Sequence, residues 1–363
     1  MRFTVTTLDL ISALSTVTRA LAARPVRPIM DGVLIQAKDG TVRLTATDGS
    51  MTIRADIPAL VDSEGSTVLP GRLLSDLSRR LPGAQADLIL DGNTVKVRSG
   101  KSKSMLTAMD PADFPEMLTL NGGHTMTVSA GRLKQMIGQV AFSTATEEAR
   151  PMLTGIRAES RDGRLSLTAL DGFRLAVAQH DGVAFDDFAA VIPGKAANEL
   201  ARILPGNSDV TLRITDGHME ATFDGGTLST VLLTGDYPDW RRILPQVFSN
   251  DCLVNRDEMQ SAIDRASLMA RDSHNNLIRM EVGTDSVAVS GRAEAGSVYD
   301  TVSAANTGTG LTIAFNGKYL QDVLKAIPEE RVVLHFTSAV SPCVIEPHDS
   351  KNSTYLVLPV RVS

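Results

Sequence analysis

The stretch Pro70-Gly71-Arg72 returns 123 residues later as Pro193-Gly194-Lys195, and after the same interval as Asn316-Gly317-Lys318. Four other landmarks keep this offset: Arg27-Pro28-Ile29 with Arg150-Pro151-Met152, Thr47-Asp48-Gly49 with Leu170-Asp171-Gly172, Leu81-Pro82-Gly83 with Leu204-Pro205-Gly206 and Ile327-Pro328-Glu329, and Asp113-Phe114-Pro115 with Asp236-Tyr237-Pro238. Chance rarely keeps five landmarks in register. A period of this length is longer than solenoid units and equals one ordinary globular domain. The sequence therefore predicts three tandem copies of one domain.

Length and composition agree with several well-packed domains. The chain has 363 residues, of which 43% are hydrophobic, enough to fill more than one core. Polar segments with Gly or Pro near 117–125 and 244–252 predict the linkers. We expect domains at residues 1–120, 121–247 and 248–363.

Each copy is predicted to contain two helices and about eight short strands. Apolar residues at helical spacing predict helices at 8–22, 71–81, 129–141, 194–204, 256–270 and 317–327. Thr6 with Asp9, and Asn255 with Glu258, have the spacing of capping pairs. Alternating apolar runs joined by Asp-Gly turns predict the strands. The expected fold class is α+β, with the helices on one side of antiparallel sheets.

The sequence contains no recognisable catalytic or metal-binding motif. The six histidines lack metal-ligand spacing, so we expect no metal and no cofactor. Asp48 and Asp171 each precede a glycine at the same place in two copies, which is typical of a turn residue rather than an acid or base. Cys252 and Cys343 lie in apolar strand-like segments, so they are expected to be buried free thiols. A hydrolase at a domain junction is therefore disfavoured.

The start of the chain, Met1-Arg2-Phe3-Thr4-Val5, predicts a strand rather than a signal peptide. No apolar run approaches the length of about 20 residues that a membrane helix needs. We expect a cytoplasmic protein.

Charge is divided unequally between the helices and the rest of the chain. The net charge is −6, yet the six predicted helices carry 12 Lys and Arg against 7 Asp and Glu. This asymmetry favours a basic helical face and an acidic sheet face. Aromatic residues are only 4% of the chain, so base stacking is not expected. Any contact with nucleic acid should be directed at phosphates and independent of sequence.

Three segments, in order on this threefold repeat, resemble one known family. They are Asp171-Gly172-Phe173-Arg174-Leu175-Ala176-Val177, then Asp236-Tyr237-Pro238-Asp239-Trp240-Arg241-Arg242-Ile243-Leu244-Pro245, and the tail Tyr355-Leu356-Val357-Leu358-Pro359-Val360-Arg361. Together they resemble the bacterial sliding clamp, the β subunit of DNA polymerase III, and the resemblance spans the whole chain.

The resemblance implies the DNA clamp fold, in which a head-to-tail homodimer closes a ring of six domains around duplex DNA. It implies a processivity factor rather than an enzyme. The expected partners are double-stranded DNA, the polymerase III catalytic subunit, the clamp loader and other proteins that carry a clamp-binding motif. The alternative is a clamp-like scaffold that binds partner peptides without encircling DNA.

The resemblance also implies a groove for partner peptides between the second and third domains. The positions of this chain that match the groove are Leu153, Leu170, Gly172, Phe173, Arg174, Leu175, Pro238, Arg242, Ile243, Val340, Pro342, Leu356, Leu358, Pro359, Val360 and Arg361. Apolar anchors with cations at the rim, Arg174 and Arg242 here, suit an extended peptide. The family usually has Thr and His where this chain has Leu170 and Phe173, so this groove should be more apolar.

Two further surfaces follow from the same resemblance. The DNA-binding positions that match are Arg24, Arg79 and Lys195, while the acidic loop Glu147-Glu148 departs from the family pattern. The dimer interface is expected to pack Leu77 and Leu81 of one chain on Leu268 and Met269 of the next. In that interface Lys101 and Lys103 should face acids such as Glu294.

Overall fold

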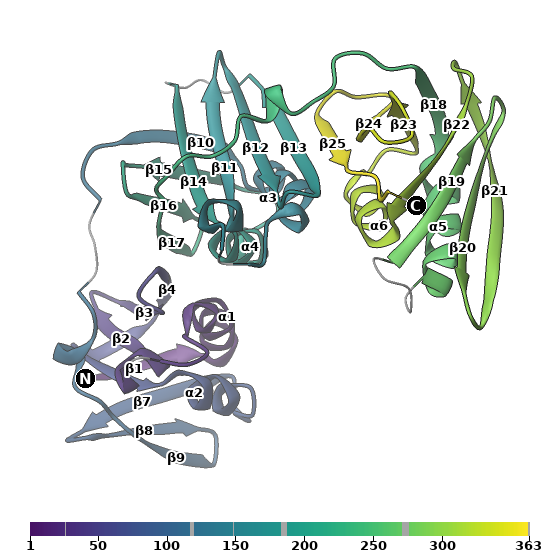
Figure 1. Ribbon diagram of the computed structural model, residues 1–363. Coiled ribbons are helices and arrows are strands. Elements are labelled where there is room, and N and C mark those ends of the chain that lie inside the picture. Colours follow the sequence, from purple (N-terminus) through teal and green to yellow (C-terminus); the bar gives the residue numbers. More distant parts are fainter. Residues whose placement is uncertain (26, 117–119, 148, 183–186, 271–275, 362–363) are drawn as a thin grey trace. The chain divides into compact units, whose positions relative to one another are not determined.

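The computed structural model describes residues 1–25, 27–116, 120–147, 149–182, 187–270 and 276–361. The chain forms two compact units. One comprises Met1–Arg132 with Arg202–Leu232, and the other comprises Leu133–Ala201 with Leu233–Ser363. The described residues of these units form three antiparallel sheets and six α-helices (Figure 1).

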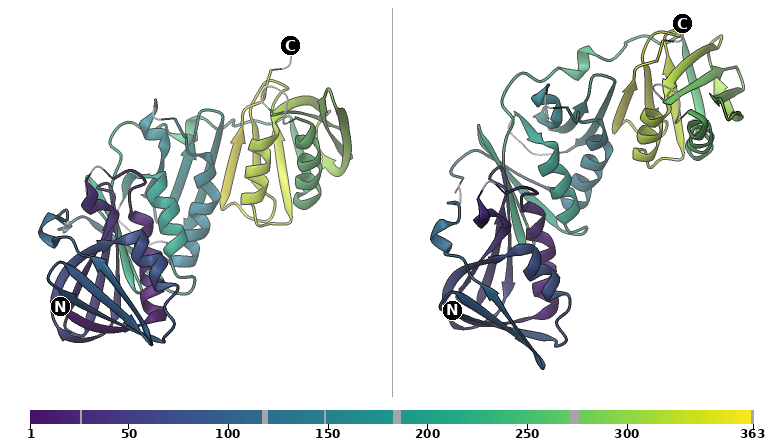
Figure 2. Two further views of the ribbon diagram at one scale, coloured as in Figure 1. Left: turned by 90° about the horizontal axis from the view of Figure 1, so that it is seen from below. Right: turned by 60° about the horizontal axis from the view of Figure 1, so that its bottom comes forward.

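The first unit contains a five-stranded sheet in the order β5-β1-β7-β8-β9. Helices α1 and α2 lie side by side over this unit (Figures 1 and 2). Their bounds are β1 (Arg2–Thr6), α1 (Thr7–Val17), β5 (Leu60–Ser63), α2 (Gly71–Ser78), β7 (Gln85–Asp91), β8 (Thr94–Ser99) and β9 (Ser102–Thr107).

The second sheet of the first unit has eight strands in the order β10-β15-β16-β17-β4-β3-β2-β6. Their bounds are β2 (Gly32–Lys38), β3 (Thr41–Thr47), β4 (Met51–Pro58), β6 (Gly65–Pro70), β10 (His124–Ser129), β15 (Asp209–Ile214), β16 (His218–Phe223) and β17 (Gly226–Val231). Strands of two repeats meet where β17 pairs with β4, from Gly226 opposite Ala55 to Thr230 opposite Met51. This pairing explains why a compact unit includes part of the second repeat.

The second unit contains a twelve-stranded sheet in the order β14-β11-β12-β13-β25-β24-β23-β18-β21-β20-β19-β22. The strands are β11 (Gly155–Arg161), β12 (Arg164–Leu170), β13 (Arg174–Asp181), β14 (Phe188–Pro193), β18 (Asn250–Asn255), β19 (Leu277–Val282), β20 (Ser286–Ala293), β21 (Gly296–Asn306), β22 (Leu311–Asn316), β23 (Arg331–Phe336), β24 (Cys343–Pro347) and β25 (Ser353–Val357). Here β13 pairs with β25, which again joins two repeats.

The remaining helices are α3 (Ala130–Val140), α4 (Gly194–Ile203), α5 (Arg256–Ala270) and α6 (Gly317–Ala326). Helices α5 and α6 pack against each other in the second unit (Figure 2). The prediction of an α+β class with two helices in each copy is confirmed. The described residues give nine, eight and eight strands in the three copies, against about eight expected.

The glycine that opens the second helix of every copy is fixed by close packing. A Cβ added at Gly71 would lie 2.8 Å from Leu21 Cδ1. At Gly194 it would lie 2.6 Å from Thr154 O, and at Gly317 it would lie 2.4 Å from Ser267 Oγ. Any larger residue would have to displace a neighbour. In all three copies the first residue of this helix therefore packs closely against neighbouring residues, which accounts for the repeated glycine.

The predicted capping pairs are present. Thr6 Oγ1 accepts the backbone N–H of Asp9 at 3.0 Å, and Asn255 Oδ1 accepts that of Glu258 at 3.0 Å. Two helices end at least three residues earlier than predicted. Helix α1 ends at Val17 and is followed by a 3-10 turn at Thr18–Ala20, and α2 ends at Ser78. Among the residues that the model describes, no helix is long and apolar enough to cross a membrane.

Helix α1 supplies a direct test of core packing, because it carries one buried and one exposed leucine. Leu14 is fully buried, whereas Leu8 is 76% exposed. We expect Leu14→Ala to lower the free energy of unfolding by about 2–5 kcal/mol, since it removes buried methyl groups and leaves a cavity. The matched control Leu8→Ala should change it by less than about 0.5 kcal/mol. Urea unfolding followed by circular dichroism measures both, and equal losses would contradict this packing.

Candidate functional site

A buried apolar cluster lies beneath the predicted groove in the second unit. Leu153, Leu170, Leu175 and Leu356 belong to it, together with Tyr237. The tyrosine hydroxyl donates to Thr168 O at 3.2 Å, and burial raises its pKa. Four of the predicted groove residues are therefore core residues. They can form a floor, but they offer little surface of their own.

Five exposed apolar residues lie close in the sequence to members of this cluster, and we call them the patch: Phe173, Ile243, Val247, Val340 and Leu358. Each lies within four residues of a member of the cluster or of a residue packed against it. Phe173 is the turn residue between Leu170 and Leu175 and is 59% exposed. Exposed apolar side chains that gather in this way usually mark an interaction site. Pro238 and Arg242 are also exposed near the patch.

The tail that follows β25 is held by backbone hydrogen bonds at two places. The N–H of Leu358 donates to Phe173 O at 2.9 Å, and the N–H of Val360 donates to Ala314 O at 2.8 Å. Cys343 pairs with Val357, so Pro342 lies beside the start of the tail. These contacts bring the sequence-predicted tail residues next to the patch.

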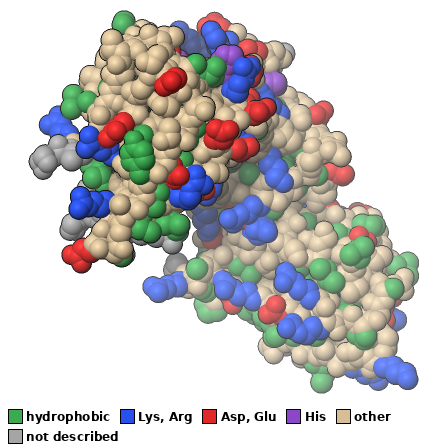
Figure 3. Space-filling view, turned by 90° about the vertical axis from the view of Figure 1, so that its right-hand side faces the viewer, with side chains coloured by type: hydrophobic (Ala, Val, Ile, Leu, Met, Phe, Trp, Pro, Cys, Tyr) green, Lys and Arg blue, Asp and Glu red, His purple; other side chains and the backbone are tan. Residues whose placement is uncertain are grey.

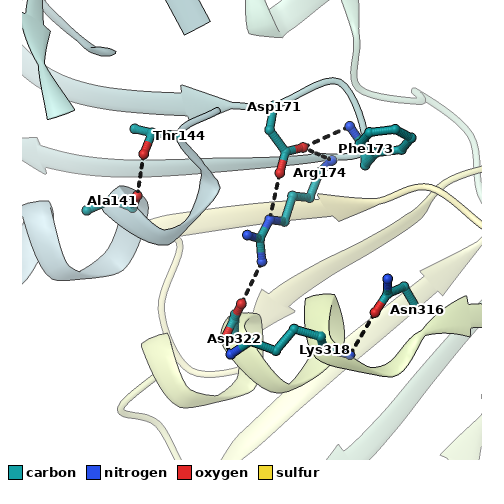
Figure 4. Close-up of polar contacts among 8 residues, drawn as sticks. All are labelled: Ala141, Thr144, Asp171, Phe173, Arg174, Asn316, Lys318 and Asp322. Carbon is teal, nitrogen blue, oxygen red and sulfur yellow. Dashed lines mark hydrogen bonds and ion pairs between the residues drawn. The ribbon is translucent and has the colours of Figure 1, made fainter. Parts of the chain in front are cut away.

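Arg174 lies inside the site, and the prediction that it stands at the rim is wrong. Its side chain is 12% exposed, and Nη1 donates to Asp322 Oδ2 at 2.7 Å (Figure 4). Nε donates to Asp171 Oδ2 at 3.0 Å. The guanidinium carbon also lies 4.6 Å from the ring centre of Tyr319 and 5.3 Å from that of Phe142, which are cation–π distances. The exposed cation of the pair is Arg242.

A cavity of about 690 Å³ opens beside this arginine. Arg150, Gly172, Phe173, Arg174 and Tyr319 all line it. Phe173 stacks on Tyr319 with the ring centres 6.2 Å apart. Sequence reasoning missed Tyr319 and Val247. The only local signal for Tyr319 was its place next to the repeated Gly317-Lys318, which suggested a helix position and nothing more.

The prediction that Asp48 and Asp171 are turn residues is confirmed. Asp171 Oδ1 accepts the backbone N–H groups of Phe173 at 2.8 Å and Arg174 at 3.0 Å. Asp48 Oδ1 makes the same two bonds, to Ser50 at 2.9 Å and Met51 at 2.8 Å. Both carboxylates are therefore committed to the backbone of their own turn.

The cations predicted to contact DNA lie at the surface. Arg24 is exposed in the loop after α1, and Lys195 is exposed in the first turn of α4. Arg79 follows α2, and its Nη2 donates to Ser15 Oγ at 3.3 Å. In the acidic loop, Glu147 is exposed and lines the cavity beside Arg174. Glu148 lies outside the described residues.

The residues predicted for the dimer interface flank two strand edges. Lys101 and Lys103 are exposed at the start of β9, which is the last strand of its sheet. Leu77 and Leu81 near the end of α2 are half-buried, and Leu268 at the end of α5 is 52% exposed. Met269 is half-buried, and Glu294 is exposed in the turn before β21.

The cysteines are free and buried as predicted, and burial raises the pKa of Cys252 to about 11 and also raises that of Cys343. A protonated, buried thiol is a poor nucleophile. Within the described part of the chain, no group of three His, Cys, Asp or Glu could hold a metal ion.

Family models of the DNA polymerase III beta subunit match this chain in three successive parts. The N-terminal domain model matches residues 1–118, the central domain model 127–239 and the C-terminal domain model 241–361. The beta sliding clamp of Staphylococcus epidermidis is 34% identical over 378 residues, with 99% of each chain covered.

Solved structures of sliding clamps share the fold over the whole chain. The DNA polymerase sliding clamp of Bacillus subtilis has a TM-score of 0.96 and 30% identity, with 100% of each chain covered. The sliding clamp of Pseudomonas aeruginosa bound to griselimycin has a TM-score of 0.95 and 25% identity, again with 100% of each chain covered.

Proposed function

Because this chain belongs to the DNA polymerase III beta subunit family of sliding clamps, we propose that three of its surfaces bind a partner peptide, duplex DNA and a second copy of the chain. The chain has the three-domain clamp fold and the function of a sliding clamp, which gives the polymerase processivity in DNA replication and is not an enzyme. Its partners are DNA, polymerase III and clamp-binding peptides, and it forms a homodimeric ring. We also propose domain boundaries at 120/121 and 247/248 and a cytoplasmic location.

For the peptide surface, we propose the exposed apolar patch with the tail as one wall. The observation that carries this proposal is that Phe173, Ile243 and Leu358 are exposed, and that each lies within three residues of a member of one buried cluster or of a residue packed against it. The buried leucines of the predicted set act as a floor, and Pro238, Arg242 and Arg361 line the outside. An extended peptide with apolar residues near its end fits such a surface. Small interfaces of this kind bind in the micromolar range, on the order of −8 kcal/mol.

Replacing two patch residues should remove peptide binding and leave the fold intact. We expect Ile243→Ser with Leu358→Ser to weaken binding of a polymerase III C-terminal peptide by about a hundredfold, since each exposed apolar anchor contributes roughly 1.5 kcal/mol. Leu60→Ser is the control, because Leu60 is 68% exposed and belongs to the first unit. Calorimetry gives both affinities. Full affinity in the double variant would mean that the peptide binds elsewhere.

The dimer surface is proposed from the order of strands in the repeats. In the first two copies, the strand after the Asp-Gly turn pairs with the last strand of the following copy. β17, the last strand of the second copy, pairs with β4 of the first, and β25, the last of the third copy, pairs with β13 of the second. β21 of the third copy corresponds to these acceptor strands, and β9 is the last strand of the first copy. We infer that β9 of one molecule pairs with β21 of another, head to tail.

Both strands have an edge available for this pairing among the described residues. β9 ends its five-stranded sheet. β21 pairs with β20 along Gly296–Ser303, whereas β18 reaches only residues 304–306 on its other side. Figure 3 faces the side on which β21 lies in Figure 1, and it shows hydrophobic side chains in separate patches among charged ones. An unpaired edge strand readily accepts another strand.

The repeats also predict the register of this pairing. In the first repeat, the residue pairings lead from Pro70 across β2 and β3 to β4. In the third repeat, the equivalent pairings lead from Asn316 across β19 and β20 to β21. Comparing the two paths makes Ala55 in β4 and Asp300 in β21 equivalent residues. Gly226 and Ser102 each begin a last strand after a two-residue turn. Since Gly226 pairs with Ala55, Ser102 should lie opposite Asp300, and Ser104 opposite Val298. In this register Asp300 is the carboxylate nearest Lys101 and Lys103, and Glu294 lies beyond the end of the strand.

A disulfide cross-link tests this register. Ser104 and Val298 correspond to the directly opposed pair Leu228 and Ile53, and side chains in such a pair are close enough for a disulfide. We expect Ser104→Cys with Val298→Cys to give a covalent dimer on mild oxidation. Ser104→Cys with Ala304→Cys is the control, because position 304 lies six residues further along the strand. Non-reducing electrophoresis separates the products, and equal cross-linking in both variants would refute the register.

For the DNA surface, we propose Arg24, Arg79 and Lys195, with the ring enclosing the duplex. Their exposure and their places on or beside helices support this. An acidic chain of net charge −6 gains little from phosphate contacts alone. Enclosure allows retention with few contacts. The alternative scaffold that binds peptides without encircling DNA would bind circular and linear DNA alike.

Retention on DNA should depend on the topology of the DNA. After loading onto a nicked circle, we expect the protein to stay bound, and to leave when a restriction enzyme linearises the circle. Arg24→Ala with Lys195→Ala should lower loading several-fold and change the salt dependence by about two phosphate contacts. Lys38→Ala with Arg164→Ala, which removes two exposed strand cations, is the control. Gel filtration of the DNA fraction measures retention, and equal retention after linearisation would favour the scaffold.

A further inference from the structure

The strongest unexplained feature of the site is a partly buried ion pair that joins two repeats. Arg174 belongs to β13 of the second copy, and Asp322 belongs to α6 of the third, 148 residues away. Their side chains are 12% and 14% exposed. Asp322 also accepts Lys318 Nζ at 2.6 Å, and Asn316 Oδ1 accepts the backbone N–H of Lys318 at the start of the helix (Figure 4). The ion pair is therefore attached to a well-anchored helix end.

The first repeat provides an internal control for what this ion pair does. Its equivalent turn is closed by Asp48 with the same two backbone bonds, yet the position of Arg174 is taken by Met51. The turn therefore forms without an arginine. In the second repeat the arginine must serve something other than the turn itself.

The geometry points to the cavity wall. Arg174 lies under the ring of Tyr319, and Tyr319 stacks on Phe173. Asp322 follows Tyr319 by about one turn of the same helix. Because Asp322 binds Arg174, it fixes the distance between the guanidinium and the Tyr319 ring. We propose that Asp322 is a positioning residue for partner peptides: it keeps Arg174 beneath Tyr319, shapes the cavity and neutralises the guanidinium, so that the cavity takes an uncharged part of the peptide.

The charges around Arg174 support this selectivity. Asp171 and Asp322 both bind its guanidinium. A carboxylate on an entering peptide would have to displace one of them and would be repelled by the other. Without Asp322, one side of the guanidinium would be open, and an acidic side chain in the cavity would gain a partner. This inference rests on the proposed peptide surface.

An aspartate scan of the peptide separates this role from a purely structural one. The probe is a fluorescein-labelled ten-residue peptide from the C-terminus of the polymerase III catalytic subunit of the same organism, with each residue replaced in turn by Asp. Fluorescence anisotropy measures its affinity for the full chain and for Asp322→Asn. We expect Asp322→Asn to bind the unaltered peptide about tenfold more weakly than the original chain does. We also expect the affinity for one Asp-substituted peptide, relative to the affinity for the unaltered peptide, to be about tenfold higher in this variant.

Two further variants complete the test. Asp322→Glu keeps the charge and should restore the preference of the original chain. Lys318→Met removes the other partner of Asp322 and should leave the preference unchanged. A uniform loss for all peptides in Asp322→Asn, or no change, would overturn the proposal. If the original chain binds no peptide, or binds it equally after deletion of residues 358–363, the peptide surface itself is wrong. Thermal unfolding and the mass of the dimer establish that each variant is folded.

Discussion

The backbone ladder between the last strand of one repeat and the acceptor strand of the preceding repeat underlies the whole molecule. β17 on β4 and β25 on β13 satisfy backbone groups that neither repeat could satisfy alone. Among the described residues, the same rule leaves one side of β9 and one side of residues 296–303 of β21 unpaired in a single chain. An open strand edge is a liability for a folded protein, and this supports the proposal that a second copy completes both strands.

The first two repeats share this strand pairing and differ in the side chains at the turn before the acceptor strand. Both Asp48 and Asp171 close their turn with the same backbone hydrogen bonds. After the glycine of the turn come Ser50 and Met51 in the first repeat, and Phe173 and Arg174 in the second. An exposed phenylalanine and a buried arginine at one junction therefore distinguish it from the other. The scaffold is repeated, whereas the chemistry of the partner site belongs to one copy.

What the sequence could predict follows from the range of the interactions. The caps at Thr6 and Asn255 and the aspartate turns depend on residues two or three apart, so their patterns are local and were predicted correctly. The burial of Leu153 and Leu356, and the partner of Arg174, depend on residues over a hundred positions away. Tyr319 and Val247 escaped notice for the same reason, because nothing near them in the sequence distinguishes a surface aromatic or valine from any other.

The weak DNA affinity expected of an acidic chain is consistent with its function once the ladder is taken into account. Phosphate contacts from many cations would raise affinity and also impede movement along the duplex. A ring closed by the strand pairing that we propose would separate these demands, because retention would depend on β9 and β21 and sliding on sparse contacts such as the proposed Arg24 and Lys195. The net charge of −6 then limits non-specific adhesion. On this proposal, the stability of the ring and its mobility on DNA could be adjusted at different places in the chain.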